Sequence, residues 1–310
     1  MKTIADHVED YLKLRRSLGF KLRVNGYILR NFAKYCGEHG ASHITTNLAL
    51  QWAVMPDDIK PPQRAVRLGM VRVFARYLAA VDPRTEIPPK GLLTAKRARS
   101  VIGFYRDDQV AALVTAAVTV CKTDSFKGLT CSTLFGLLAV TGMRVGEAIA
   151  LKCSDVDLDQ GLLSLSVTKC DRKRLVPLHP TAVRELTRYL NVRAELHSPS
   201  AAASFFVTSS GAPLPYSTVN HWFLTLARRI GLRGVAPAPG IRLHDLRHHF
   251  AIRTLLDWYQ EDTDVGVHLP DLATYLGHCH VSDTYWYLSA VPELLQLASR
   301  RWKGSEGGRL

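Results

Sequence analysis

Apolar residues recur at helical intervals through most of residues 1–81. This spacing predicts four helices, over 4–18, 26–36, 47–54 and 61–80. Gly19 and Gly37 stand where the first two helices should end, and the pair Pro61 and Pro62 stands where the fourth should begin. The first part of the chain therefore reads as a small helical domain.

The helix predicted over 61–80 combines apolar and arginine residues. Its expected apolar stripe consists of Val66, Met70, Val73, Phe74 and Tyr77. Arginines cover much of the remaining surface, at Arg64, Arg67, Arg72 and Arg76. Arginine on one side of an amphipathic helix is typical of a surface that faces phosphates, and a merely solvated face is the alternative.

Residues 82–100 differ in character, because they are rich in Pro, Lys and Arg and show little periodicity. This composition predicts a basic linker between two domains.

A second domain is predicted over 101–310. Helical spacing returns over 107–120, 132–140, 143–151, 180–197 and 217–230, and again from His244. Strict alternation of apolar and polar residues over 163–168 predicts a strand, with 174–178 as its partner across a polar turn. The predicted fold class is mainly α with a small antiparallel β-sheet.

Composition excludes several classes of protein. The chain has 310 residues, of which 47% are hydrophobic, so it can bury a sizeable core. It shows no apolar run long enough for a membrane span, and its charged first residues do not resemble a secretory signal. Six scattered cysteines form no CxxC pair, which argues against a zinc ribbon or a disulfide scaffold and indicates a reducing cytoplasm: Cys36, Cys121, Cys131, Cys153, Cys170 and Cys279.

The formal charge of +13 is unevenly distributed. Residues 1–100 carry +10, and 101–310 carry +3. Such a basic first domain indicates a polyanionic partner, most often nucleic acid, although a soluble basic surface would look the same. The side chains expected to bind DNA are Lys13, Arg15, Arg16, Lys21, Arg23, Arg64, Arg67, Arg72, Arg76, Lys96, Arg97 and Arg99.

Six residues of the second domain can carry chemistry: Arg144, Lys169, His244, Arg247, His278 and Tyr287. Arg144 follows a Thr-Gly turn, and Lys169 ends the alternating strand. His244 and Arg247 are three apart and share a helix face. His278 follows Gly277, a predicted helix cap, and precedes Tyr287 by nine residues. Each residue alone is more often structural, so the ordered combination carries the case.

This ordered combination resembles the catalytic domain of the tyrosine recombinase (phage integrase) family. The family pattern is an Arg after a Thr-Gly turn, a Lys in a β-hairpin, H-x-x-R, L-G-H and a Tyr about nine residues later. The resemblance covers about 101–300, and residues 1–100 are similar in length and helical content to the family's core-binding domain. Family hairpins often place Gly beside the Lys, where this chain has Cys170, so Lys173 is a second candidate for that role.

The residue types suit attack on a phosphodiester. Two arginine forks, Arg144 and Arg247, can stabilise the negative charge on the phosphate oxygens. Tyr287 is the expected nucleophile, and its 3′-phosphotyrosyl intermediate conserves the energy of the broken bond, so no cofactor is expected. Because the two arginine forks supply positive charge, no metal ion is expected either. The resemblance implies that Lys169 protonates the leaving 5′-oxygen. His244 and His278 can bind the phosphate or manage the nucleophile's proton.

Two other tyrosines lie close in the sequence. Tyr285 points to a different helix face from Tyr287, and Tyr275 precedes the L-G-H motif inside a predicted helix. The family spacing selects Tyr287, and packing is the expected role of both others.

The C-terminal segment predicts a further helix, which begins at Pro292 and has an apolar side formed by Leu294, Leu295 and Leu297. This helix either closes its own domain or, as is common in the family, docks on a neighbouring protomer. The tail resembles recombinases of transposable elements more than chromosome-dimer resolvases. The resemblance implies a homotetramer on double-stranded DNA, with related recombinases or accessory proteins as further partners. It implies a cytoplasmic, nucleoid-associated enzyme for integration, excision or transposition of a mobile element.

Three alternatives remain open at this point. A catalytically silent relative would keep the basic domain without the chemistry, and a type IB topoisomerase would share the chemistry without partner sites. A metal-dependent phosphohydrolase would use the His244-Asp245 pair, His248 one helical turn later, and His278 with His280. This third alternative leaves the arginines and the tyrosine spacing unexplained. Activity that persists in a chelator would exclude it.

Overall fold

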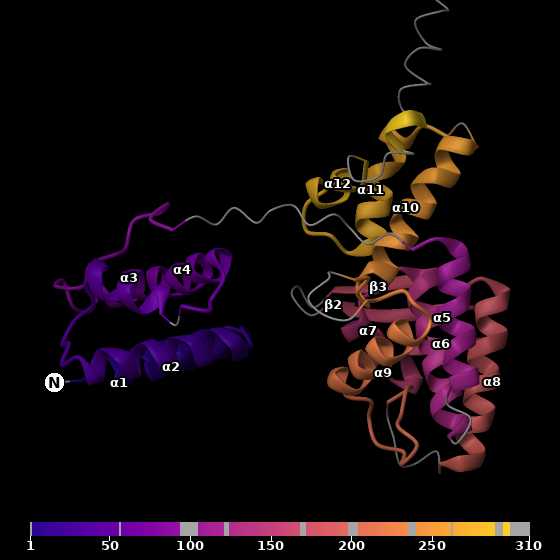
Figure 1. Ribbon diagram of the computed structural model, residues 1–310, viewed down its shortest axis with the longest axis horizontal. Coiled ribbons are helices and arrows are strands. Elements are labelled where there is room, and N and C mark those ends of the chain that lie inside the picture. Colours follow the sequence, from indigo (N-terminus) through magenta and orange to yellow (C-terminus); the bar gives the residue numbers. More distant parts are fainter. Residues whose placement is uncertain are drawn as a thin grey trace, which may run out of the picture. The chain divides into compact units, whose positions relative to one another are not determined.

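The computed structural model describes residues 2–55, 57–93, 105–120, 124–167, 172–197, 204–234, 240–261, 263–288 and 294–297. The chain divides into two compact units, Met1–Ser100 and Val101–Leu310. Figure 1 shows the elements of each unit.

The first unit contains the four predicted helices: α1 (Ile4–Ser17), α2 (Arg23–Glu38), α3 (Thr46–Val54) and α4 (Pro61–Leu78). Thr3 caps α1 by a reciprocal capping box with Asp6, which satisfies two of the free donors at the helix start. The aromatic rings of Phe32 and Trp52 meet edge to face in the core, with centroids 5.1 Å apart.

The apolar stripe predicted for α4 is right for Met70, Phe74 and Tyr77, which lie in or against the core, and wrong for its two valines. Val66 and Val73 are 43% and 50% exposed, whereas Leu68, Val71 and Leu78 are buried with Phe74. Both sets have helical spacing, so periodicity alone could not decide which set faces the core.

The beginning of the predicted linker is attached to the first unit. The backbone of Thr46 donates to Glu86 Oε2 at 2.7 Å, and the backbone of Glu86 donates to the Ile44 carbonyl at 2.8 Å. Arg72 donates to the carbonyls of Pro88 and Pro89, each at 2.7 Å. These hydrogen bonds hold residues 82–93 against the helices, and 94–100 lie outside the described residues.

The second unit contains the helices α5 (Asp107–Val120), α6 (Ser125–Thr141), α7 (Val145–Ala150), α8 (Pro180–Leu196), α9 (Tyr216–Arg229), α10 (Asp245–Gln260), α11 (Val265–Leu276) and α12 (Ser282–Leu288), with a 3-10 turn, Cys153–Asp155. Its strands β1 (Val156–Asp157), β2 (Leu162–Val167) and β3 (Arg172–Pro177) form an antiparallel sheet in the order β1-β2-β3. The predicted fold class, mainly α with a small antiparallel sheet, is confirmed.

Helix α6 is the centre of this unit. It lies between α5 and α8 (Figure 1), and it also packs against α10. Most of its residues are buried, on all sides of the helix, which explains why its sequence is apolar throughout. The helices α10, α11 and α12 gather at one end of the unit, where a second apolar cluster includes Leu255, Leu269 and Tyr287.

A glycine ends α6 close to α10. Gly142 has φ +59°, in the left-handed region, and a Cβ there would lie 2.4 Å from Cδ1 of Phe250. Both the backbone conformation and this close approach require glycine. The turn therefore brings Arg144, two residues later, toward the start of α10.

The hairpin of β2 and β3 is in the predicted place. Leu163 and Leu165 point into the core, and Ser166 pairs with Lys173 in the register. The turn that contains Lys169 lies outside the described residues, and so the structure does not test the role of this lysine.

Within the described part of the chain, no helix combines the length and the apolar character that a membrane crossing needs.

Candidate active site

Arg144 stands at the N-terminus of α7 and joins this helix to the end of α11. Its Nη1 donates to Glu147 Oε1 at 2.9 Å, and its backbone N–H donates to Glu147 Oε2 at 2.8 Å. Its Nη2 donates to the Gly277 carbonyl at 2.9 Å, beyond the end of α11. The side chain is 40% exposed, so its guanidinium is both oriented and accessible.

Arg247 lies in the first turn of α10 and is 2% exposed. Its Nη1 donates to the Gly142 carbonyl at 2.9 Å, and its Nη2 donates to the Leu276 carbonyl at 2.6 Å. Burial, with the positive charge of Arg144 nearby, lowers the pKa of Arg247 to about 10, which still leaves it charged at neutral pH. Arg247 thus ties the ends of α6 and α11 to α10.

Two further charged residues belong to this cluster and were missed in the sequence. Arg174 on β3 donates through Nη2 to Glu147 Oε2 at 2.7 Å, and through Nη1 to the carbonyl of Tyr275. Glu147 therefore orients two guanidiniums at once. Its place three residues after Arg144, where helical neighbours meet, is the sequence signal that could have identified it.

His278 follows Gly277, which has φ +68° and ends α11 as predicted. The Nδ1 atom of His278 lies 2.7 Å from Oγ1 of Thr284, a fully buried hydroxyl on α12. Burial and the charge of Arg247 lower the pKa of His278 to about 4, so this imidazole is neutral at pH 7.

Tyr287 is 2% exposed and lies on α12. Its ring stacks near that of His278, with centroids 6.4 Å apart, and its hydroxyl lies 3.0 Å from Nδ1 of His248. Burial raises the pKa of the phenol, and the charge of Arg247 opposes this shift. Tyr285, by contrast, is 54% exposed, and Tyr275 stacks on Phe250.

His244 stands just before α10, and its ring centroid lies 5.0 Å from that of His248. Burial and the charge of Arg247 lower the pKa of His244. His244 and Arg144 line a cavity of about 440 Å³ with Glu147 and Ser164. The structure thus brings together the predicted residues Arg144, His244, Arg247, His278 and Tyr287. Lys169 lies outside the described residues, and the side chain of Lys173 does too.

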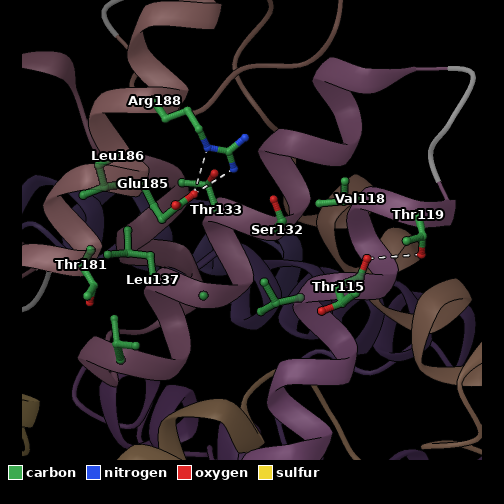
Figure 2. A pocket seen from close by; sticks show the side chains of 14 residues that line it. Thr115, Val118, Thr119, Ser132, Thr133, Leu137, Thr181, Glu185, Leu186 and Arg188 are labelled. Carbon is green, nitrogen blue, oxygen red and sulfur yellow. Dashed lines mark hydrogen bonds and ion pairs between the residues drawn. The ribbon is translucent and has the colours of Figure 1, made fainter.

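A second cavity, of about 470 Å³, lies between α5, α6 and α8. Figure 2 shows its mixed lining, in which Val118 and Leu137 stand beside polar residues such as Thr133. None of the predicted catalytic residues lines it, whereas Arg144 and His244 line the smaller cavity.

The arginines of the first unit differ in their surroundings. Arg67 donates to the Trp52 carbonyl at 2.8 Å, with its guanidinium 4.0 Å from the centroid of the Trp52 ring, and Arg64 donates to the Asp57 carbonyl at 2.8 Å. Arg15 stacks over Phe20 at 3.8 Å. Together with Arg72, which binds the linker segment from α4, these side chains help to hold the unit together. The exposed members of the predicted DNA-binding set are Lys13, Arg16, Lys21, Arg23 and Arg76, while Lys96, Arg97 and Arg99 lie outside the described residues.

The end of the chain is described only at 294–297, which are helical. Leu294 is buried in the same apolar cluster as Tyr287, and Leu295 is 52% exposed. Docking of this helix on a neighbouring protomer stays a prediction, and Pro292 lies outside the described residues.

Two of the histidines that a metal-dependent phosphohydrolase would use as ligands make other contacts. His248 contacts the hydroxyl of Tyr287, and His278 contacts that of Thr284. Among the described residues, no three or more His, Cys, Asp or Glu side chains are arranged to hold a metal ion.

The site histidines should make the second unit less stable in mild acid. The pKa of His248 and that of His278 are each lowered to about 4, against about 6.5 for a histidine in an unfolded chain. Between these values the unfolded state binds more protons, so stability is fully present above pH ~6.5 and falls as the pH drops toward ~4. Each histidine contributes at most about 1.4 kcal/mol per pH unit.

Urea unfolding at several pH values between 5 and 7.5 measures this effect. We expect the midpoint to rise with pH, and a His248→Asn variant to show a shallower rise. A midpoint that does not change over this range would contradict the expectation.

Comparison with known proteins gives a match over most of the second unit. Residues 104–293 match the phage integrase family. An integrase/recombinase of Sinorhizobium fredii, y4rB, is 44% identical over 308 residues, which cover 97% of this chain and 97% of that protein. The tyrosine recombinase XerD of Rhizobium meliloti is 31% identical over 242 residues, which cover 76% of this chain and 72% of that protein.

A likeness to solved structures extends over both units. The Tn1549 transposon integrase, solved in complex with a circular intermediate DNA, has a TM-score of 0.70 at 13% identity, and the match covers 97% of this chain and 100% of that chain. At such identity the likeness shows the fold alone. Fold, sequence relatives and family match together define a tyrosine site-specific recombinase. The chain belongs to the phage integrase family.

Proposed function

We propose that this recombinase cleaves and rejoins DNA through a 3′-phosphotyrosyl bond to Tyr287, and that it serves the integration, excision or transposition of a mobile element. The observation that carries the first part is the buried Tyr287 hydroxyl in one cluster with Arg144, Arg247 and two neutral histidines. The similarity to a relative named as an integrase over 97% of this chain supports the second part.

Arg144 and Arg247 bind the scissile phosphate in this proposal. Each uses part of its guanidinium for backbone carbonyls, which fixes its orientation before DNA arrives, and each retains further N–H donors for phosphate oxygens. Donors that are fixed in advance stabilise the developing charge without reorganising during the reaction. Glu147, which also pairs with Arg174, holds Arg144 in place.

Lys169 protonates the leaving 5′-oxygen in this proposal, as the resemblance to the family implies. The phosphotyrosyl bond retains the energy of the broken phosphodiester, so rejoining needs no ATP. The two guanidiniums supply the positive charge that a metal ion supplies in other phosphoryl-transfer enzymes.

Double-stranded DNA is the proposed substrate, and a homotetramer on DNA in the cytoplasm is the proposed working form. Exchange between two duplexes breaks four strands, and each protomer contributes one nucleophile, Tyr287. Four protomers therefore match one complete exchange. The exposed basic residues of α1 and α2, such as Lys13 and Arg23, are the proposed phosphate contacts of the first unit.

A nicked substrate tests the proposal. Nicked DNA from the ends of the element that carries this sequence is incubated with the full chain in the presence of a chelator. Because of the nick, cleavage releases a short fragment that diffuses away, and the covalent intermediate accumulates. We expect a covalent protein–DNA band on a denaturing gel. Bound DNA without such a band would support a silent DNA-binding relative. Relaxation of supercoiled plasmids that lack the element ends would support a type IB topoisomerase.

A further inference from the structure

His248 contacts the nucleophile directly. It lies on α10, immediately after Arg247 and one turn after His244, and its side chain is 12% exposed. Its Nδ1 lies 3.0 Å from the Tyr287 hydroxyl, and its ring packs against that of Trp286, with centroids 5.5 Å apart. The site described above assigns this histidine no role in the reaction.

We propose that His248 accepts the phenol proton when Tyr287 attacks DNA, and that Asp245 positions His248 and stabilises its protonated form. This inference rests on the proposed role of Tyr287 as the nucleophile.

The geometry selects His248 among the site histidines. The hydrogen bond that joins the Tyr287 hydroxyl to an imidazole in the described structure goes to His248. The Nδ1 atom of His278 is instead engaged with Thr284, and its ring lies parallel to the tyrosine ring. A general base must lie within hydrogen-bond reach of the proton that it removes, and His248 meets this condition.

The charge state of His248 suits a proton acceptor. Burial, His244 and the positive charges of Arg242 and Arg247 lower its pKa to about 4, and the carboxylate of Asp245 opposes them. The imidazole is therefore neutral at pH 7, and Nδ1 accepts the phenol hydrogen bond in the tautomer that carries its proton on Nε2. A DNA phosphate that enters beside Arg247 brings negative charge, which raises the pKa of His248 at the moment of reaction.

Asp245 is placed to stabilise the protonated imidazole. Its carboxylate is 1% exposed and is fixed by Arg242, whose backbone N–H donates to Oδ2 at 2.8 Å and whose Nη2 donates to Oδ1 at 2.9 Å. Oδ1 lies 3.9 Å from His248 Nε2. The two groups form an ion pair when the imidazole gains its second proton. The imidazole of His248 thus has Tyr287 at its Nδ1 and Asp245 near its Nε2, so the carboxylate can stabilise the charge that the imidazole gains from the phenol proton.

The proposed step balances. The Tyr287 oxygen forms a bond to phosphorus, the bond from phosphorus to the 5′-oxygen breaks, and the phenol proton moves to His248 Nδ1. The 5′-oxygen takes a proton from the general acid proposed above, Lys169. Rejoining runs the same transfers in reverse, so His248 returns the proton to Tyr287.

Two substitutions test this role by the rate of covalent complex formation on the nicked substrate. His248→Asn places an amide oxygen near the Nδ1 position, which retains a hydrogen-bond acceptor but takes no proton. We expect His248→Asn and His248→Ala to cleave roughly 10²-fold more slowly at pH 7 with DNA binding unchanged. His268→Ala, an exposed histidine on α11, is the matched control and should cleave normally.

The pH profile separates a proton acceptor from a structural residue. Without the base, the phenol of Tyr287 must first lose its proton to solvent. The cleavage rate of both His248 variants should therefore rise with pH up to ~9 more steeply than the rate of the wild-type protein. A substrate with sulfur in place of the leaving 5′-oxygen needs no general acid, so the variants should remain slow on it. Full recovery on that substrate, or a wild-type rate for His248→Asn, would overturn the proposal.

Tyr287→Phe separates a wrong nucleophile from a wrong role for His248. If Tyr287→Phe still forms the covalent complex, the proposed nucleophile itself is wrong. If it is inactive and His248→Asn is fully active, the nucleophile is right and only the role of His248 is wrong.

Discussion

Tyr287→Phe is expected to abolish the covalent protein–DNA complex while the protein still folds and binds DNA. The substitution removes one oxygen atom, so the ring keeps its packing in a site that is 2% exposed. The lost hydrogen bond to His248 should cost about 1 kcal/mol of stability, a small effect beside the complete loss of a nucleophile. Gel analysis with the nicked substrate and a filter-binding titration measure the two properties separately.

Tyr285→Phe is the matched control, because this tyrosine lies two residues away on the same helix and is 54% exposed. It should leave cleavage unchanged. Cleavage by Tyr287→Phe, or its loss in Tyr285→Phe alone, would show that the spacing after His278 selects the wrong tyrosine.

Arg247→Ala is expected to reduce both cleavage and stability. Removal of one preorganised donor to a developing oxyanion typically lowers the rate by about 10²–10³-fold. The substitution also leaves the carbonyls of Gly142 and Leu276 without this donor in a buried place, at about 1–3 kcal/mol each. The single-turnover cleavage rate and the free energy of unfolding in urea measure the two losses.

Arg253→Ala, on the same helix, provides the comparison. Arg253 is 51% exposed and pairs with Asp107 and Asp257 at the surface, where ion pairs contribute about 0–1 kcal/mol. It should therefore change little. A normal cleavage rate in Arg247→Ala would refute its assignment to the phosphate, and normal stability would show that its carbonyl contacts do not support the fold.

Sequence periodicity was sufficient to predict most of the elements, because helices and strands bury side chains at fixed intervals. The ends of α6 and α11 followed from Gly142 and Gly277, both in the left-handed region. Periodicity could not orient α4, since Leu68 and Val73 belong to two apolar sets with the same spacing. Only packing against the other helices determines which set is buried.

The site was predictable where the family motif specifies residues, and it was not where contacts join distant segments. Arg174 reaches the Tyr275 carbonyl across 101 positions of sequence, which no local pattern encodes. The spacing of His248 to His244 indicates only a possible metal ligand, whereas the fold directs its Nδ1 to Tyr287. Arg67 and Arg72, two of the expected DNA contacts, also donate to backbone carbonyls of their own unit, which no local pattern encodes.

The cluster around Glu147 places three guanidiniums, those of Arg144, Arg174 and Arg247, beside a single carboxylate. Burial lowers the pKa of Arg247, and the like charges of Arg144 and Arg174 lower it further. The remainder of the domain must therefore supply the free energy that keeps this site assembled when it is empty. In the proposed function a bound phosphate would offset this repulsion, so substrate affinity and the stability of the fold would be thermodynamically linked. Substrate binding is therefore expected to raise the free energy of unfolding of the second unit.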